Sequence, residues 1–232
     1  MKLLSILTLI FSTSIHAELE PITVMYYERP PLYFTAEDGT PSGKMVDHLN
    51  AKLQTTKYKI KYQVIPPKRQ FLKIEANNEP ICGLGWFKNA SREKTGKFSI
   101  SLLKDKPLVI VAHKDIPFKD NQSIKDFFFR TDLKFLKKDG FSYGKELDEL
   151  EKKYNVLKHI VTVSTENMVR MLMLRKQYYT FLDVDEIEYI FNKDPSLKKD
   201  IHYTRFNETP DGNHRYLYCT KQVPDEFINS IK

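Results

Sequence analysis

The sequence predicts an α/β fold with mainly parallel sheets, because apolar runs typical of strands alternate with helical periods along the chain. An apolar strand is expected at 22–27 and an alternating strand at 57–65, and between them Val46, Leu49 and Leu53 share one face of a helix. Strands that alternate with helices are typical of lobes with mainly parallel sheets. The chain has 232 residues, enough for one large domain or two small lobes with their own cores.

The same alternation continues through the rest of the chain. Further strands are expected at 81–87, 107–112, 133–135, 160–163, 179–182 and 216–220. Further helices are expected at 71–74, 147–154, 165–172 and 224–231. Ser164 or Thr165 can cap the third of these helices, and Pro224 opens the last. No repeat or low-complexity tract is visible, so nearly all of the chain after its first 17 residues is expected to fold.

The composition is that of a soluble globular protein with a basic surface. Hydrophobic residues make up 41% and charged residues 29%, which excludes wholesale disorder. The formal net charge of +7 could attract nucleic acid. The lysines are spread over many faces, however, as where Lys57, Lys59 and Lys61 alternate with other residues. We therefore expect a solvated basic face and no nucleic-acid partner.

The first 17 residues have the layout of a secretory signal peptide. Lys2 gives a positive start, 3–11 is an apolar run, and Ala17 is a small residue at the end. A membrane anchor is the alternative, but it needs roughly 20 apolar residues, and polar residues at 12–14 interrupt the run. We expect cleavage after Ala17 and export to the periplasm.

No motif for catalysis, a metal or a cofactor stands out. The sequence has no G-x-S-x-G elbow, P-loop, G-x-G-x-x-G or H-E-x-x-H pattern. Its six histidines are dispersed, and its two cysteines do not have zinc-binding spacing. We therefore expect no metal and no cofactor.

The segment Gly-Trp-Phe-Lys-Asn-Ala-Ser-Arg-Glu-Lys-Thr-Gly-Lys-Phe-Ser at 85–99 is the most informative. It places Arg92 seven residues after Gly85 and six residues before an aromatic–Ser pair. This spacing resembles the signature of the family 3 extracellular solute-binding proteins, which have the type II periplasmic-binding-protein fold. The resemblance implies that Arg92 binds a ligand carboxylate, which suits the planar fork of a guanidinium. The alternative is a surface arginine paired with Glu93 or another acid.

Other segments resemble the same family in the same order. They are Arg-Pro-Pro-Leu-Tyr at 29–33, Asp-Gly at 38–39, Gly-Lys-Met-Val-Asp at 43–47, Gly-Phe-Ser-Tyr-Gly at 140–144, a helix and strand at 165–185, and Val-Pro-Asp-Glu at 223–226. The resemblance implies two lobes joined by a hinge of two crossovers, with a ligand cleft between them. Lobe one is expected at 18–107 plus 206–232, and lobe two at 108–205.

The resemblance also implies further ligand-binding residues in the cleft. Backbone N–H groups near Ser142 and Tyr143, at a helix start, would bind an anion. Asp183, or as second choice Asp185, would accept hydrogen bonds from a cationic or hydroxylated part of the ligand. The lobe-one wall is expected to contain Tyr26, Arg29, Trp86 and Phe87. Core packing is the alternative for the last two.

Two departures from the family pattern weaken the case for an α-amino-acid ligand. The family often has Thr three residues before the arginine, where this chain has Asn89. The family's usual Gly-Arg-x-Asp before the strand of lobe two is replaced by Lys-Gln-Tyr-Tyr at 176–179.

Cys82 and Cys219 are the only cysteines, and an exported chain meets an oxidising compartment. In the fold that the chain resembles, the strand with Cys82 lies beside the strand that returns from lobe two, which here carries Cys219. The resemblance therefore implies a disulfide within lobe one. Two separate buried thiols are the alternative.

The predicted function is capture of a small polar, carboxylated ligand, amino-acid-like or organic acid, for uptake or sensing. The protein is expected to be a monomer and not an enzyme, and an inner-membrane permease or sensor is the candidate partner. One alternative is a small periplasmic lyase or dehydratase on the same fold, with Glu28, Glu166 and Asp183 as candidate general acids or bases. Another is a sensory or accessory binding protein without a transporter.

Overall fold

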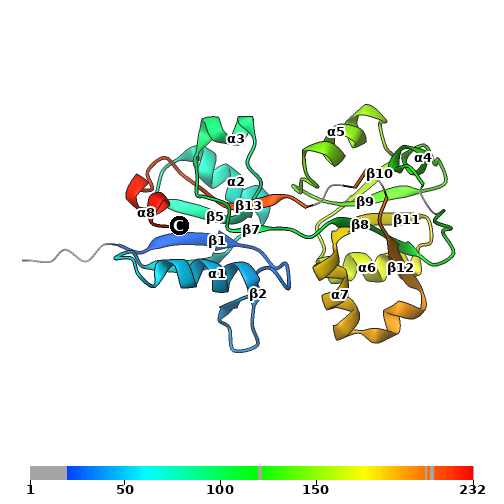
Figure 1. The fold of residues 1–232 in the computed structure, drawn as a ribbon, viewed down its shortest axis with the longest axis horizontal. Helices are drawn as coiled ribbons and strands as arrows, with labels where there is room; N and C mark the ends of the chain where they lie inside the picture. The colour runs from blue at the N-terminus through cyan, green and yellow to red at the C-terminus, as the bar shows by residue number, and fades with distance from the viewer. Residues whose placement is uncertain (1–19, 120–121, 207, 210–211, 232) are drawn as a thin grey trace, which may run out of the picture.

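The chain forms two α/β lobes, each built on one sheet (Figure 1). The computed structural model describes residues 20–119, 122–206, 208–209 and 212–231. The predicted cleavage site after Ala17 therefore lies outside the described residues. Within the described residues, no helix has the length and apolar character needed to cross a membrane.

Lobe one contains the strands and helices near both ends of the chain. Its strands are β1 (Ile22–Tyr26), β2 (Phe34–Thr35), β3 (Pro41–Ser42), β4 (Ile60–Val64), β5 (Ile81–Trp86), β6 (Lys97–Phe98), β7 (Leu103–Lys104) and β13 (His214–Cys219). Its helices are α1 (Lys44–Leu53), α2 (Pro67–Ala76), α3 (Ala90–Thr95) and α8 (Asp225–Ser230).

Lobe two contains the middle of the chain. Its strands are β8 (Leu108–His113), β9 (Lys134–Lys138), β10 (Lys158–Val161), β11 (Tyr178–Asp183) and β12 (Ile201–Thr204). Its helices are α4 (Ile124–Phe128), α5 (Lys145–Lys153), α6 (Thr165–Leu174), α7 (Val184–Lys193) and the 3-10 helix η1 (Pro195–Lys199). We keep the lobe boundaries expected from the sequence as a proposal.

Both sheets are mixed, which refines the expectation of mainly parallel sheets. The order is β4-β1-β5-β13-β6 in lobe one, where β7 also pairs with β13, and β10-β9-β11-β8-β12 in lobe two. The pairs β1–β4, β1–β5, β9–β10 and β9–β11 are parallel. The strands that enter a sheet directly after crossing between the lobes, β8 and β13, run antiparallel to their neighbours. The α/β class is confirmed.

Apolar layers cover both faces of the lobe-one sheet. Side chains alternate across a strand, and β1 accordingly sends Val24 into the cluster formed with α1 and Met25 into the cluster formed with α2. Val46, Leu49 and Leu53 of α1 are buried, as the helical period predicts, and Met45 is buried with them. Since both its faces are covered, β1 is buried along its whole length.

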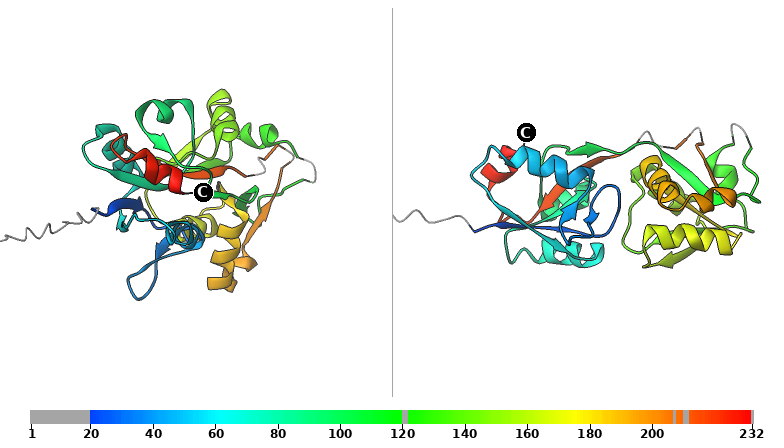
Figure 2. Two further views of the ribbon diagram at one scale, coloured as in Figure 1. Left: turned by 60° about the vertical axis from the view of Figure 1, so that its left-hand side comes forward. Right: turned by 90° about the horizontal axis from the view of Figure 1, so that it is seen from below.

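The two chain crossings between the lobes lie side by side (Figures 1 and 2). The first joins β7 to β8 and the second joins β12 to β13. The backbone N–H of Asp105 donates to the carbonyl of Asn213 across the two crossings, with an N–O distance of 2.9 Å. The side chains of Asp105 and Arg215 also form a buried ion pair between them.

The predicted disulfide between Cys82 and Cys219 is present in the structure. The two residues face each other on the antiparallel strands β5 and β13. Both are fully buried in the apolar cluster between the lobe-one sheet and α1. The bond joins positions 137 residues apart, one before the first crossing and one after the second.

Candidate functional site

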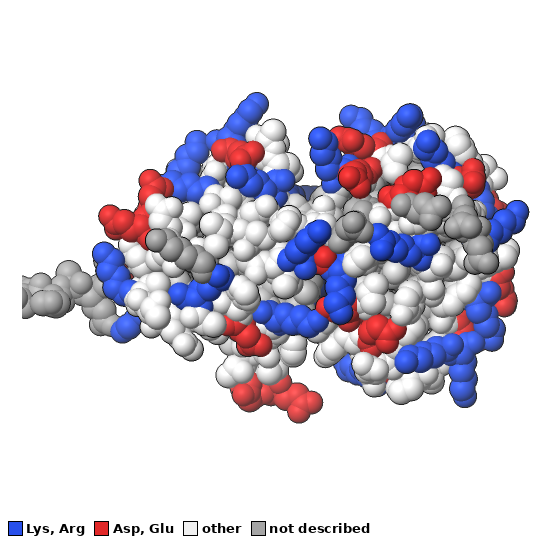
Figure 3. Space-filling model, viewed as in Figure 1, with Lys and Arg blue, Asp and Glu red and all other residues white. Residues whose placement is uncertain are grey.

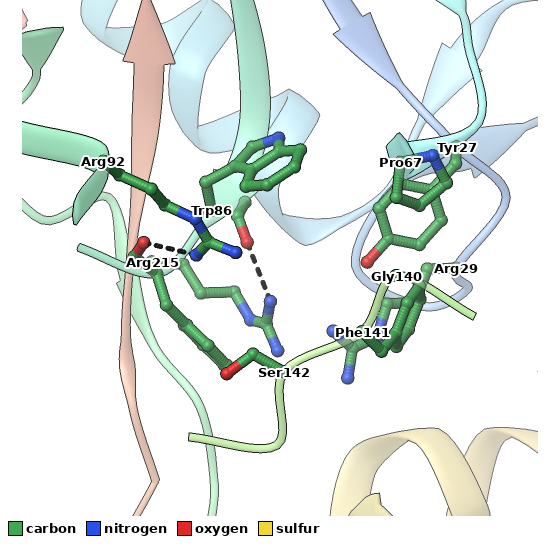
Figure 4. A pocket seen from close by; sticks show the side chains of 11 residues that line it. Tyr27, Arg29, Pro67, Trp86, Arg92, Gly140, Phe141, Ser142 and Arg215 are labelled. Carbon is green, nitrogen blue, oxygen red and sulfur yellow. Dashed lines mark hydrogen bonds between the residues drawn. The ribbon is translucent and has the colours of Figure 1, made fainter. Parts of the chain in front are cut away.

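A pocket opens between the two lobes near the crossings. Figure 3 shows a notch between the lobes with basic side chains on both sides, and Figure 4 shows the pocket from close by. Its free space, including the part open to solvent, is about 350 Å³. It is lined by Tyr27, Arg29, Pro67, Gly85, Trp86, Phe87, Arg92, Gly140, Phe141, Ser142 and Arg215. The lining comes from the ends of β1, β5 and β13, from the start of α2 and from α3 in lobe one, and from the loop after β9 in lobe two.

Arg92 lies in this pocket, held by the short helix α3. Its guanidinium lies 4.6 Å from the centre of the Trp86 ring and donates to the carbonyl of Phe87 at 2.7 Å (Figure 4). Within the described chain, no carboxylate forms an ion pair with Arg92. Glu93, the acid that follows it in the sequence, pairs with Lys88. Partial burial lowers the pKa of Arg92, because it withdraws part of the guanidinium from water.

Asn89 sets the start of the helix that carries Arg92. Its side-chain oxygen accepts a hydrogen bond from the backbone N–H of Arg92 at 2.9 Å, which makes Asn89 the N-cap of α3. Asn is as good an N-cap as Ser or Thr. Asn89 therefore fixes the start of α3 although it replaces the family's usual Thr.

Gly85 is required by the local geometry of β5. Its φ is +81°, which side chains rarely tolerate, and an added Cβ would lie 2.5 Å from the Tyr33 ring. Its carbonyl accepts a hydrogen bond from Arg215 at 2.8 Å.

Besides this hydrogen bond to Gly85, the Arg215 guanidinium lies 4.5 Å from the centre of the Phe87 ring and pairs with Asp105. Arg215 is thus held from three sides within the protein.

Arg29 enters the pocket but is already paired across the lobes. Its Nε and Nη2 atoms donate to the two carboxylate oxygens of Glu186, on α7, at 2.7 and 2.6 Å. Both residues are buried. Burial alone would raise the pKa of Glu186, but the adjacent Arg29 charge and its hydrogen bonds outweigh this effect and lower it. Arg29 therefore lines the predicted wall, but its guanidinium already binds the carboxylate of Glu186.

The loop at Ser142 and Tyr143 also has a resident acid. Asp148 of α5 accepts hydrogen bonds from the Ser142 hydroxyl and from the Tyr143 backbone N–H. The Tyr143 side chain is buried, and its hydroxyl accepts from the backbone N–H of Lys138 at 3.3 Å. Ser142 lines the pocket, but Tyr143 is not among the lining residues. The predicted anion-binding N–H of Tyr143 is occupied by Asp148.

Asp183 is the N-cap of α7 and is not among the residues that line the pocket. Its Oδ1 atom accepts from the backbone N–H of Asp185 at 2.7 Å, and the backbone N–H of Asp183 donates to Glu186 at 3.3 Å. Burial, with a smaller effect of nearby Glu186 and Asp105, raises its pKa from 3.8 to about 7. The structure therefore gives Asp183 a role in helix capping.

Asp185, the second choice, is also committed within the protein. It forms ion pairs with Lys44 of α1 and with Lys106 of the first crossing. Partial burial alone would raise the pKa of Asp185, but the hydrogen bonds and charges of the two lysines together outweigh this effect and lower it. Like Arg29 and Glu186, Asp185 and Lys44 join the two lobes.

Of the other predicted wall residues, Trp86 and Phe87 line the pocket and Tyr26 does not. Trp86 is also largely buried, and its indole N–H donates to Gln70 at 2.9 Å. Tyr26 points into the lobe-one core, and its hydroxyl bonds to Thr35 at 2.8 Å. Tyr27, one residue past the end of β1, lines the pocket in its place.

Lys138, at the end of β9, is a buried cation that the sequence analysis missed. Only 9% of it is exposed. Its ammonium lies 4.9 Å from the centre of the Phe141 ring and 5.7 Å from that of Tyr27, both of which line the pocket. Burial and the nearby Arg29 lower its pKa to about 8. No described carboxylate forms an ion pair with it, whereas its neighbour Lys137 pairs with Glu151.

Several pocket residues were not predicted from the sequence. They are Tyr27, Pro67, Gly140, Phe141 and Arg215, together with Lys138 and Glu186 beside the pocket. Gly140 and Phe141 belong to the 140–144 segment that resembles the family. Asp183 and Glu186 have the three-residue spacing of a capping box, which the structure shows. We find no sequence signal for Arg215 or Lys138.

Two candidate acids or bases of the enzyme alternative lie at another pocket. Glu28 and Glu166 line a hollow beside the β2–β3 hairpin. The Glu28 carboxylate accepts from the hydroxyl and backbone N–H of Thr35. Glu166 pairs with Arg170 and Lys193.

Comparison with known proteins gives the family. The model of "Bacterial extracellular solute-binding proteins, family 3" matches residues 22–184, which is more than half of the chain. No curated protein matches the sequence of this chain at a significant level.

Solved structures of low sequence identity share the fold. An ancestral arginine-binding protein bound to arginine is 14% identical, with a TM-score of 0.72, 92% of this chain covered and 90% of that one. A structure from a study of glutathione import in Gram-positive bacteria, including Streptococcus mutans, is 15% identical, with a TM-score of 0.73 and coverages of 91% and 86%. A histidine kinase sensor domain is 17% identical, with a TM-score of 0.70 and coverages of 92% and 88%. The family match over residues 22–184 agrees with the two lobes and the pocket between them, and the chain belongs to family 3 of the bacterial extracellular solute-binding proteins.

Proposed function

We propose that this solute-binding protein captures a small carboxylated solute in the pocket between its lobes, with Arg92 as the main anion partner. One observation carries the proposal. The Arg92 guanidinium faces the pocket, is held by a ring and a carbonyl, and pairs with no carboxylate among the described residues. Arg92 is partly buried, and a charge that is partly withdrawn from water without a counter-charge is costly. A ligand carboxylate would supply that counter-charge through two parallel hydrogen bonds.

The ion pair of Arg29 and Glu186 supports a binding cycle in which the lobes close over the ligand. This pair joins the loop after β1 to α7 across the cleft. A ligand shifts a protein toward the state in which it has more contacts. A solute that bridges Arg92 of lobe one and the loop around Ser142 of lobe two would favour the closed state.

The closed, loaded protein would then be recognised by a partner in the inner membrane. We propose a permease for uptake, with a sensor as the second candidate. Proteins with this fold include one studied in glutathione import and a histidine kinase sensor domain. We propose that the protein reaches the periplasm after cleavage behind Ala17 and acts there as a monomer.

A thermal-shift screen of the purified mature protein tests the proposal. The compounds are organic acids, amino acids, small peptides and, as neutral controls, sugars. A specific ligand at 100 times its Kd adds about 2.7 kcal/mol to the free energy of unfolding, which raises the Tm by roughly 5–11 °C for a protein of this size, since each 1 kcal/mol raises it by about 2–4 °C. We expect such a rise with carboxylated compounds only. If no carboxylated compound raises the Tm, the proposal is contradicted.

A further inference from the structure

The charged side chains that line the pocket are all cations. Arg29, Arg92 and Arg215 are among the eleven lining residues, and no carboxylate is. Arg29 and Arg215 are neutralised by Glu186 and Asp105, but Arg92 is not paired with an acid in the described chain. The lining therefore offers a counter-charge for an anion and none for a cation.

Four described acids beside the pocket, Glu186, Asp185, Asp148 and Asp183, already have contacts within the protein. Glu186 holds the fork of Arg29 with both oxygens. Asp185 pairs with two lysines. Asp148 accepts hydrogen bonds at the start of α5, and Asp183 caps α7. A ligand ammonium would have to share one of these carboxylates with the groups of the protein that it already binds.

The aromatic rings of the pocket face cations as well. Trp86 lies against Arg92, Phe87 against Arg215, and Phe141 against both Arg29 and Lys138. A ring attracts a cation through its negative face, and each of these rings already has at least one cation of the protein beside it. The rings therefore hold the protein's own cations in place.

We infer that the ligand of this pocket is an organic acid without an ammonium group, and not an α-amino acid. The inference rests on the proposed function, because it assumes that Arg92 binds a ligand carboxylate. Like charges at short range repel each other strongly where water is scarce. The ammonium of Lys138 already lies beside the pocket rings, 4.9 Å from the centre of Phe141, and burial, followed by the charge of Arg29, lowers its pKa to about 8. A ligand ammonium would enter the same field without the anchoring of a protein side chain.

Calorimetry with matched compounds tests the inference on the mature protein. The series are succinate, malate and aspartate, and glutarate, 2-hydroxyglutarate and glutamate. Within each series only the substituent changes, from hydrogen to hydroxyl to ammonium. We expect the first two members to bind at least tenfold more tightly than the amino acid in the series that fits the pocket. Asp183→Asn keeps an N-capping side chain and should leave the affinity for the organic acids the same or slightly higher.

Each contrary outcome has a distinct meaning. If the amino acids bind as tightly as the acids without ammonium, the inference is wrong and the proposed function stands. Aspartate or glutamate binding that is lost selectively in Asp183→Asn would also overturn it, because Asp183 would then accept the ammonium. If no member of either series binds, and no other carboxylated compound stabilises the protein, the proposed function itself fails.

Discussion

Arg29 of lobe one and Glu186 of lobe two form a two-point ion pair, with N–O distances of 2.7 and 2.6 Å, inside the cleft. The two residues lie 157 positions apart in the chain, and both are buried. A buried pair of this kind adds little stability over apolar packing, but removal of one partner leaves an unpaired buried charge. The protein can avoid that cost by opening its lobes, which lets water reach the remaining charge.

Glu186→Gln should therefore open the cleft. Glutamine keeps the shape of the side chain but removes the negative charge that neutralises Arg29. The radius of gyration of the ligand-free protein, measured by small-angle X-ray scattering, should rise. The matched control is Lys44→Gln, which weakens the exposed pair with Asp185 across the same cleft and should change the radius little. An equal radius for Glu186→Gln and the wild type would show that the ion pair does not hold the lobes together.

The raised pKa of Asp183 predicts a pH dependence of stability. Burial raises that pKa from 3.8 to about 7 in the folded protein. Between about pH 4 and pH 7 the folded state then binds more protons than the unfolded state, so the free energy of unfolding falls as the pH rises. Asp183→Asn cannot ionise and should lack this loss. Urea titrations at pH 5 and pH 8 should show the variant gaining stability relative to the wild type at the higher pH. A difference between the two proteins that does not vary with pH would contradict the prediction.

The disulfide should stabilise lobe one. Cys82 and Cys219 lie 137 residues apart, so their bond restricts the unfolded chain strongly. Replacing both with Ser should lower the free energy of unfolding by about 2–4 kcal/mol. Periplasmic material, denatured without reductant, should show no titratable thiol. Two titratable thiols in that material would mean that the bond does not form in the cell.

The N-terminal segment should be removed on export. The positive start at Lys2, the apolar run and the small residue Ala17 motivate this prediction. Intact-mass analysis of the periplasmic fraction should give a chain that begins at Glu18. A chain that keeps Met1 and fractionates with the membrane would refute both the cleavage and the proposed location.

Features that depend on local pattern were predictable from the sequence. The period of Val46, Leu49 and Leu53 gave α1, and the apolar run at 81–87 gave β5 within one residue. The bond between Cys82 and Cys219 followed from the order of strands in the fold that the chain resembles. In these cases, local periodicity or strand adjacency settles the structure.

Features that depend on contacts between the lobes were not predictable in the same way. Arg29 was expected to bind the ligand, yet the structure pairs it with Glu186, and no local signal joins two positions 157 residues apart. Asp183 was expected in the cleft, but it ends β11 and begins α7, and a short acidic side chain at a helix start caps the helix. Tyr26 was expected in the wall, but the strand alternation turns it into the core. Lys138 resembles its solvated neighbours in the sequence, and only the fold buries it.

The affinity of Arg92→Ala for the organic acid that binds best in calorimetry tests the central claim most directly. The control is Lys94→Ala, which removes an exposed cation from the same helix α3. Loss of a charge-assisted pair that leaves a partner charge buried costs about 2–5 kcal/mol. Arg92→Ala should therefore bind at least about 30-fold more weakly than the wild type, since 1.4 kcal/mol is a factor of ten, and Lys94→Ala should bind as the wild type does. Arg92→Lys should restore only part of the affinity, because an ammonium cannot offer two parallel donors. Arg92→Ala binding within twofold of Lys94→Ala would contradict the claim that Arg92 binds the solute.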